Sequence, residues 1–148
     1  MKVLLQRSKN SQVTINGKVN GSIENGYVCL VGFTNGDTKE LIDKMVKKII
    51  NLRVFEDENE KMNLSILDVN GNILSISQFT LYADVTKGNR PSFVNAMKPD
   101  EASNLYDYFN KKLNEFVHVE TGIFGSDMKV LIYNDGPVTI MLDSDKLF

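Results

Sequence analysis

The chain of 148 residues contains no tryptophan, one cysteine and one histidine. A single cysteine excludes a disulfide within the chain, which fits a reducing compartment. Cys29 stands in the apolar run 27–31, where a buried structural thiol is the expected role. With His118 as the only histidine, the sequence offers neither a His/Cys metal cluster nor a Cys–His pair for nucleophilic catalysis. We therefore predict no metal and no other cofactor.

Long apolar runs are also missing. No stretch approaches the ~20 residues that a membrane-spanning helix needs, and Arg7 interrupts the N-terminal region before a signal-peptide-like segment could develop. The expected location is therefore the cytoplasm. A net charge of −2 gives no general affinity for nucleic acid. Basic groups gather only locally, in two sets that also fit a solvated helix face and a loop: Lys44, Lys47 and Lys48, and Lys87, Arg90 and Lys98.

What is present is the composition of an ordinary globular protein. Apolar residues make up 42% of the chain and charged residues 24%. No repeat, low-complexity tract or linker divides the sequence, so residues 1–148 are expected to form one domain.

Alternating and continuous apolar runs bounded by turn residues predict several short strands. Asn16-Gly17 and Asn70-Gly71 are the dipeptides favoured in tight hairpin turns, because both central positions of such turns need positive φ. A further turn is expected at Asn134-Asp135-Gly136-Pro137. The predicted strands cover residues 3–7, 11–15, 18–23, 27–33, 65–69, 73–81, 129–133 and 138–142.

Two helices are expected to cover the strands. The first begins at Asp37 as N-cap, with Glu40 completing a capping-box pattern before apolar residues at helical spacing up to Leu52. Residues 86–98 are predicted to form a loop, after which Pro99 suits the first turn of a second helix. Leu105, Phe109, Leu113 and Phe116 form the apolar stripe of that helix. The predicted fold is α+β, with a mainly antiparallel, partly closed sheet or barrel and two principal covering helices.

Three segments carry more polar and glycine residues than a simple scaffold needs. Residues 77–84 place Ser77, Gln78 and Thr80 beside Phe79 at the expected end of a strand, where polar groups can hold a ligand. Residues 122–128 allow backbone N–H groups to converge in a tight turn beside an aromatic ring that can stack on a base. Residues 134–139 can present backbone carbonyls in a rigid geometry. Taken singly, these segments are better explained as a strand end, a loop and a β-turn.

Taken together, five segments resemble the D-aminoacyl-tRNA deacylase family over nearly the whole chain. They are Val3-Leu4-Leu5-Gln6-Arg7, Ser77-Gln78-Phe79-Thr80-Leu81, Lys87-Gly88-Asn89-Arg90-Pro91-Ser92-Phe93, Gly122 to Met128, and Gly136-Pro137-Val138-Thr139. Each pattern is weak alone, but all five occur in order at this chain length. Ser126 stands where the family often has alanine.

The resemblance implies a homodimer whose active sites lie at the subunit interface. Gly136-Pro137 matches the family's Gly-cisPro element, which one subunit inserts into the pocket of the other. Rigid backbone carbonyls beside the substrate's α-carbon would exclude an L side chain and admit a D one, and achiral glycine would also pass. Arg7 matches the position that holds this element, because a guanidinium fork suits backbone carbonyls.

The remaining site residues follow from the same resemblance. Ser77, Gln78, Phe79 and Thr80 match residues that line the pocket, and Phe124, Gly125 and Met128 match the loop near the terminal adenosine of tRNA. The implied mechanism is substrate-assisted: the 2′-hydroxyl of the terminal ribose helps water attack, and backbone N–H groups such as those of Phe79 or Thr80 stabilise the oxyanion. Thr80 as a covalent nucleophile is the lesser alternative, because no base is evident to activate it.

The implied function is hydrolysis of D-aminoacyl-tRNA, and of misacylated glycyl-tRNA, as chiral proofreading in translation quality control. The expected partners are a second copy of the chain and the acceptor end of aminoacyl-tRNA, with no DNA and no membrane. Three alternatives stay open: a non-catalytic dimeric module that binds nucleotides or aminoacyl-tRNA ends, a related deacylase with a trans Gly-Pro bond that acts on L-amino acids, and a hydrolase of another small ester.

Overall fold

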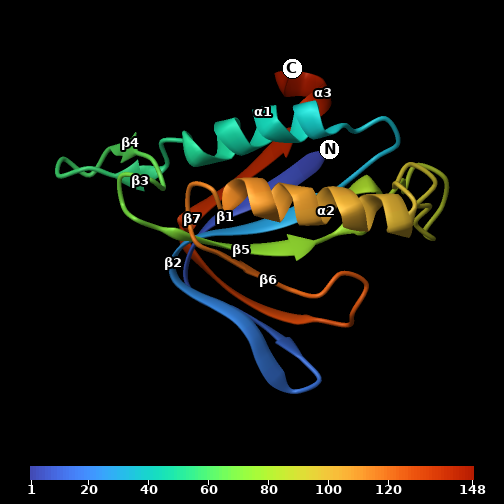
Figure 1. Ribbon diagram of the computed structural model, residues 1–148, viewed down its shortest axis with the longest axis horizontal. Coiled ribbons are helices and arrows are strands. Elements are labelled where there is room, and N and C mark those ends of the chain that lie inside the picture. The colour runs from blue at the N-terminus through green and yellow to red at the C-terminus, as the bar shows by residue number, and fades with distance from the viewer.

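The computed structural model describes all residues from 1 to 148 and is built on a five-stranded sheet with two helices on one face (Figure 1). The strand order is β6-β5-β2-β1-β7. The strands are β1 (Lys2–Ile15), β2 (Lys18–Gly32), β5 (Asn72–Ser77), β6 (Val119–Thr121) and β7 (Lys129–Asp143). The covering helices are α1 (Lys39–Ile50) and α2 (Pro99–Leu113). The smaller elements are β3 (Phe55–Glu56), β4 (Met62–Leu64), the 3-10 helix η1 (Phe79–Tyr82) and α3 (Ser144–Leu147).

The α+β class and the two covering helices are confirmed, and the sheet is open, with β6 and β7 at its edges. β1 pairs antiparallel with β2 and with β7, whereas β5 runs parallel to both β2 and β6. The predicted barrel does not close, because β6 and β7 do not pair.

The core lies between the sheet and the two helices. Tyr27, Ile42, Ile73 and Phe109 are fully buried there, and they come from two strands and both helices. Cys29 is fully buried in the same cluster, and burial raises the pKa of its thiol, so the predicted structural role is confirmed. A smaller cluster around Val28 fills the opposite side of the sheet. None of the helices has the length and apolar character that crossing a membrane requires.

The first hairpin follows the sequence closely. Asn16 and Gly17 have φ of 50° and 76°, which confirms the predicted tight turn. The four strands predicted over residues 3–33 merge into β1 and β2, because the polar residues between them continue the pairing from Lys2↔Gly32 to Ile15↔Lys18. The two long strands therefore form one ribbon that projects below the helices (Figure 1).

Four local predictions are wrong. Residues 66–70 form a turn in place of a strand, because Asp68 accepts hydrogen bonds from the backbone and hydroxyl of Ser65. Asn70-Gly71 does not make a hairpin, since the next strand, β5, pairs in parallel with β2. The strand expected over residues 73–81 ends at Ser77, where η1 follows. β7 runs without reversal through Gly136-Pro137, so residues 134–137 are not a turn between strands.

The two covering helices differ from the predictions at one end each. The N-cap of α1 is Thr38, whose hydroxyl accepts a hydrogen bond from Leu41 N–H at 3.3 Å. Asp37 instead accepts hydrogen bonds from the terminal ammonium of Met1 and from Thr34 N–H. α2 begins at Pro99 as predicted, whereas Phe116 lies beyond its end and is exposed.

Candidate active site

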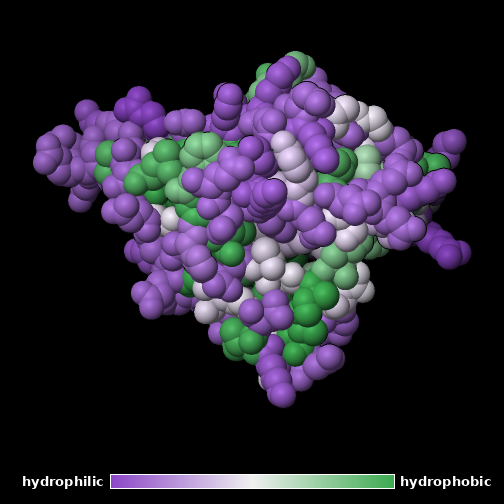
Figure 2. Space-filling view, viewed as in Figure 1, coloured by the Kyte–Doolittle hydropathy of each residue, from purple (hydrophilic) through white to green (hydrophobic).

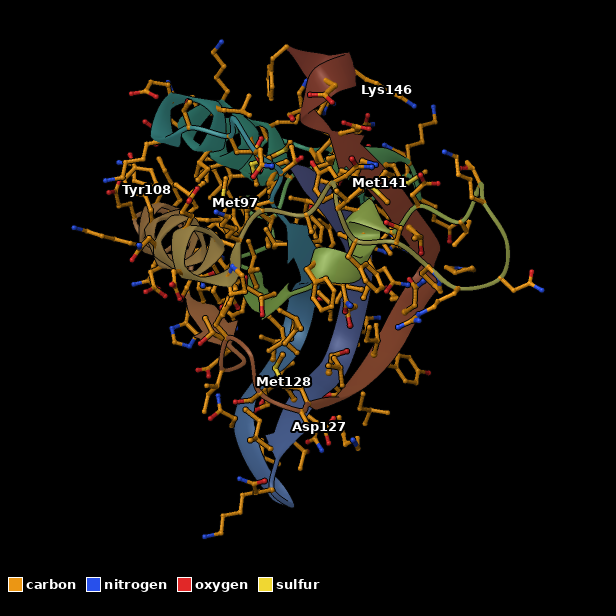
Figure 3. The ribbon with its side chains drawn as sticks, turned by 90° about the vertical axis from the view of Figure 1, so that its right-hand side faces the viewer. Met97, Tyr108, Asp127, Met128, Met141 and Lys146 are labelled. Carbon is orange, nitrogen blue, oxygen red and sulfur yellow. The ribbon has the colours of Figure 1, made fainter.

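A cavity of about 710 Å³ opens where β5 ends, between the start of α2 and the segment 122–128. This volume falls within the range of small-molecule sites, and most of the lining residues are hydrophobic, as is usual for such sites. Figure 3 faces this end of the molecule and labels Met97 and Met128, which line the cavity from above and below.

The end of β5 supplies one wall. Ser77 is its last residue, and the backbone N–H of Gln78 donates to the Val31 carbonyl at 2.7 Å, which holds the departing chain against β2. Ser77, Gln78 and Phe79 all line the cavity. Phe79 and Thr80 are the first two residues of a 3-10 helix, so their backbone N–H groups have no acceptor within that helix and can donate to a ligand.

Thr80 lies next to this wall but does not line the cavity. Its exposed hydroxyl makes a short hydrogen bond with the side-chain amide of Gln78, and this is its only side-chain hydrogen bond. An amide cannot take a proton from a hydroxyl at neutral pH. The surroundings of Thr80 therefore position the hydroxyl without activating it as a nucleophile.

The segment 122–128 supplies the opposite wall, and Phe124, Gly125 and Met128 line the cavity as a group. The ring of Phe124 lies 6.0 Å from that of Tyr106, whose hydroxyl donates to the Ser75 carbonyl at 2.7 Å. Because Tyr106 is buried and hydrogen-bonded, it gives Phe124 a fixed support. An aromatic ring and a thioether along one wall suit a flat, polarisable ligand.

Sequence reasoning assigned no role to several lining residues. Phe93 packs edge-to-face on Phe79 with ring centroids 4.9 Å apart, and Met97 and Ala102 continue the apolar surface towards α2. The available signal was the apolar pair Phe93-Val94 within an otherwise polar loop, which has no reason to be apolar unless it meets a ligand or another surface.

Arg7, Gly136 and Pro137 form a second group that does not line this cavity. Arg7 is 6% exposed and donates to the carbonyls of Val54 at 2.8 Å and Asp135 at 3.2 Å. Its guanidinium also pairs with the carboxylates of Asp135 at 3.3 Å and Glu56 at 3.5 Å. The Gly136–Pro137 bond is cis, and both residues are exposed on β7.

Gly136 cannot be replaced without displacing this second group. Its φ is +120°, and a Cβ atom there would lie 2.9 Å from Arg7 Nη2 and 2.9 Å from Val138 Cγ2. The guanidinium of Arg7 therefore packs directly against the backbone of Gly136 while it binds the carbonyl of the preceding residue. One buried side chain fixes the exposed Gly136–Pro137 backbone.

We expect Arg7→Lys to lower the free energy of unfolding by about 2–3 kcal/mol, because an ammonium cannot replace both charge-assisted bonds of the buried fork. Urea denaturation would measure the change. Lys9→Ala is the matched control, since Lys9 pairs with the same Asp135 carboxylate at 3.6 Å but is half exposed. Its loss should cost under about 1 kcal/mol. Equal effects of the two variants would contradict the assigned role of Arg7.

Comparison with known proteins gives one family match and two similar solved structures. Residues 4–143 match the family model described as D-Tyr-tRNA(Tyr) deacylase. A solved structure of a c-Myc DNA unwinding element binding protein is 41% identical, with a TM-score of 0.92 over 97% of this chain and 98% of that one. A structure described as a probable eukaryotic D-amino acid tRNA deacylase is 18% identical and shares the fold, with a TM-score of 0.81 over 95% of this chain and 97% of that one.

The family match spans nearly the whole chain, and it includes both the cavity walls and the Arg7–Gly136 group. The 41% identical relative is superimposable over almost its full length. The chain therefore belongs to the D-Tyr-tRNA(Tyr) deacylase family, and is a hydrolase that acts on aminoacyl-tRNA.

Proposed function

We propose that this protein hydrolyses the ester of D-aminoacyl-tRNA in the cavity at the end of β5, releasing free tRNA and the D-amino acid while leaving L-aminoacyl-tRNA intact. The observation that carries this proposal is the composition of the cavity: polar residues and the available N–H of Phe79 on one wall face an aromatic and thioether wall on the other. The first wall suits the ester and its amino acid, and the second suits the terminal adenine.

The adenine would pack beside Phe124 and Met128, because base–aromatic stacking tolerates any base and needs only a π-face. Ser77 and Gln78 would then lie near the aminoacyl group. Phe79 and Thr80 would direct their N–H groups at the oxygen that becomes negative as the ester carbonyl is attacked.

The chemistry proceeds without a side-chain base. The 2′-hydroxyl of the terminal ribose orients and activates a water molecule, whose oxygen bonds to the ester carbon. The bond to the ribose 3′-oxygen breaks, and that oxygen takes up a proton to become the free 3′-hydroxyl. The protein contributes position and oxyanion stabilisation, which agrees with the absence of an activating base beside Thr80.

Rejection of L-amino acids is assigned to Gly136 and Pro137 of a second copy of the chain. Because neither residue lines the cavity of its own chain, either can act there only from a partner. β7 is a free sheet edge with exposed apolar side chains, among them Leu131, Tyr133 and Met141, which suit an interface. The face turned to the viewer in Figure 2 also carries apolar residues on its lower part, below the helices of Figure 1. Glycyl-tRNA, which lacks a side chain, would also be accepted.

Matched D-tyrosyl-tRNA and L-tyrosyl-tRNA test this proposal directly. We expect the purified protein to release tyrosine from the D-ester and to leave the L-ester unchanged at the same enzyme concentration. Preferential loss of the L-ester would indicate a deacylase of the opposite chirality. Equal turnover of D-tyrosine methyl ester, which carries no RNA, would indicate a general small-ester hydrolase.

The alternative from a different class is a non-catalytic module that binds nucleic-acid ends. It is favoured by one finding, the name of the 41% identical relative, which refers to binding of a DNA element. Survival of both tyrosyl esters at high enzyme concentration, together with binding of tRNA, would support this alternative and reject the deacylase.

A further inference from the structure

We propose that the loop 85–91 is a phosphate-binding arm, in which Lys87 and Arg90 bind the RNA backbone just before the terminal adenosine. The proposal rests on the proposed function for the occupant of the cavity. It adds where the rest of the RNA runs and which side chains hold it.

Hydrogen bonds fix the base of the arm. Asp84 and Ser92 exchange two backbone hydrogen bonds of 2.8 and 2.9 Å, which close residues 85–91 into a hairpin-like loop. The Asp84 carboxylate also accepts hydrogen bonds from the N–H and hydroxyl of Thr86 at 2.9 and 2.7 Å, and these bonds lower the pKa of Asp84. Figure 1 shows this segment reaching out beyond the start of α2, and Figure 3 shows that it projects on the side of β7.

The charges of the arm have no partner within the chain. Lys87 and Arg90 are exposed and take part in none of the ion pairs of the structure. Asp84 is the only carboxylate between residues 84 and 98, and Thr86 already occupies it. Two unpaired cations on one exposed loop form a local positive site on a protein whose net charge is −2.

The arm leads directly to the cavity. The same segment continues through Phe93 and Val94 to Lys98, and all three residues line the cavity. A nucleotide chain whose last base lies in the cavity carries its next phosphates outside the mouth. There an arginine fork and a lysine bind phosphate without regard to base sequence, as an enzyme serving many tRNAs requires.

The acidic residues around the cavity mouth also favour an RNA path towards the loop 85–91. Asp100 and Glu101 in the first turn of α2 repel a polyanion on that side of the mouth. Asp127 lines the opposite rim, where it pairs with Lys129 at 2.8 Å. Lys98 lines the cavity beside that turn and also takes part in no ion pair, but Asp100 and Glu101 offset its charge. The loop 85–91 is therefore the exit with the larger uncompensated positive charge.

A second basic surface provides the control. Lys44, Lys47, Lys48 and Arg53 surround a shallow hollow of about 490 Å³ beside Phe148. This surface lies towards the far end of α1, which Figure 1 draws on the side of β3 and β4, away from the arm. Charge removal there tests whether any loss of lysines weakens RNA binding.

The test compares Lys87→Ala/Arg90→Ala with Lys47→Ala/Lys48→Ala and the unmodified protein. The kcat/KM for D-tyrosyl-tRNA and the Kd for fluorescein-labelled uncharged tRNA are measured between 50 and 200 mM KCl. Loss of two single-strand phosphate contacts should reduce the slope of log Kd against log[KCl] by roughly 1.4. Across this fourfold salt range, the unmodified protein should therefore lose roughly sevenfold more affinity than the arm variant.

At 50 mM KCl we expect the arm variant to have a KM and a Kd roughly tenfold higher, with kcat within about twofold. The α1 variant should match the unmodified protein. An unchanged salt slope in the arm variant, or a larger loss in the α1 variant, would overturn the proposal. If the unmodified protein leaves D-tyrosyl-tRNA intact, the proposed function fails, while the Kd series still decides whether the arm binds RNA.

Discussion

Replacing Gly136 with alanine is expected to lower kcat/KM for D-tyrosyl-tRNA by at least about 100-fold, because a displacement of about 1 Å at a positioning element has an effect of this size. The new Cβ would meet Arg7 Nη2 and Val138 Cγ2, both at 2.9 Å, at a backbone φ of +120° that L-residues rarely adopt. The guanidinium, the Gly136–Pro137 backbone or both must therefore shift. Single-turnover release of tyrosine would measure the loss.

Gly36→Ala separates this effect from backbone strain alone. Gly36 has a φ of +91°, but a Cβ there would meet nothing within 4 Å. Both variants should lose about 1–2 kcal/mol of stability from the positive φ, whereas only Gly136→Ala should lose activity. If Gly136→Ala keeps full activity and D-specificity, Gly136 does not take part in chiral selection.

The same variant can show whether Gly136 acts from a partner subunit. A cavity-blocking variant such as Ala96→Trp keeps Gly136 intact, and Gly136→Ala keeps the cavity intact. Unfolding and refolding the two inactive proteins together should restore about a quarter of the normal activity, since half of the protomers form mixed dimers and each mixed dimer has one complete site. No recovery, with a dimer present by light scattering, would mean that each chain completes its own site.

Local sequence signals predicted those elements whose conformation depends on neighbouring residues. Asn16-Gly17 defined the first hairpin turn, and Pro99 defined the start of α2. The predictions failed where distant pairing decided the conformation. Asn70-Gly71 resembles a hairpin turn, but β5 finds its partner in β2, more than 40 residues earlier in the chain.

The proposed site residues were predicted from the sequence, and the family resemblance also implied that Gly136-Pro137 acts in the pocket of another subunit, but local patterns could not predict the geometry. Ser77, Gln78 and Phe79 were selected from sequence together with Phe124, Gly125 and Met128, and the structure brings these six residues to one cavity. Periodicity could not show that Gly136 lies within a continuous edge strand, away from that cavity. This separation matters for the proposed chiral selection, because Gly136 can reach a cavity only if that cavity belongs to a second copy of the chain.

Removing the 2′-hydroxyl of the substrate should have a larger effect than removing the hydroxyl of Thr80. A D-tyrosyl-tRNA ending in 2′-deoxyadenosine is expected to be hydrolysed roughly 100–10,000-fold more slowly, the range for loss of a positioned proton-transfer group. Thr80→Val, which keeps the shape and the backbone N–H, should reduce kcat less than about tenfold, because the Thr80 hydroxyl is bonded only to the Gln78 amide and is not activated.

The two effects together distinguish the substrate-assisted mechanism from the covalent one. The first requires the 2′-hydroxyl of the substrate, and the second requires the hydroxyl of Thr80. A covalent mechanism needs the Thr80 oxygen, so Thr80→Val would stop turnover and the deoxy substrate would still give a burst of free tRNA. The substrate-assisted mechanism predicts the reverse order.

Thr80→Pro tests the backbone donor separately. It removes the N–H of Thr80 as well as the hydroxyl, and should therefore be much less active than Thr80→Val if the backbone donor stabilises the oxyanion. Equal activity of these two variants would assign the oxyanion to another donor, such as the N–H of Phe79.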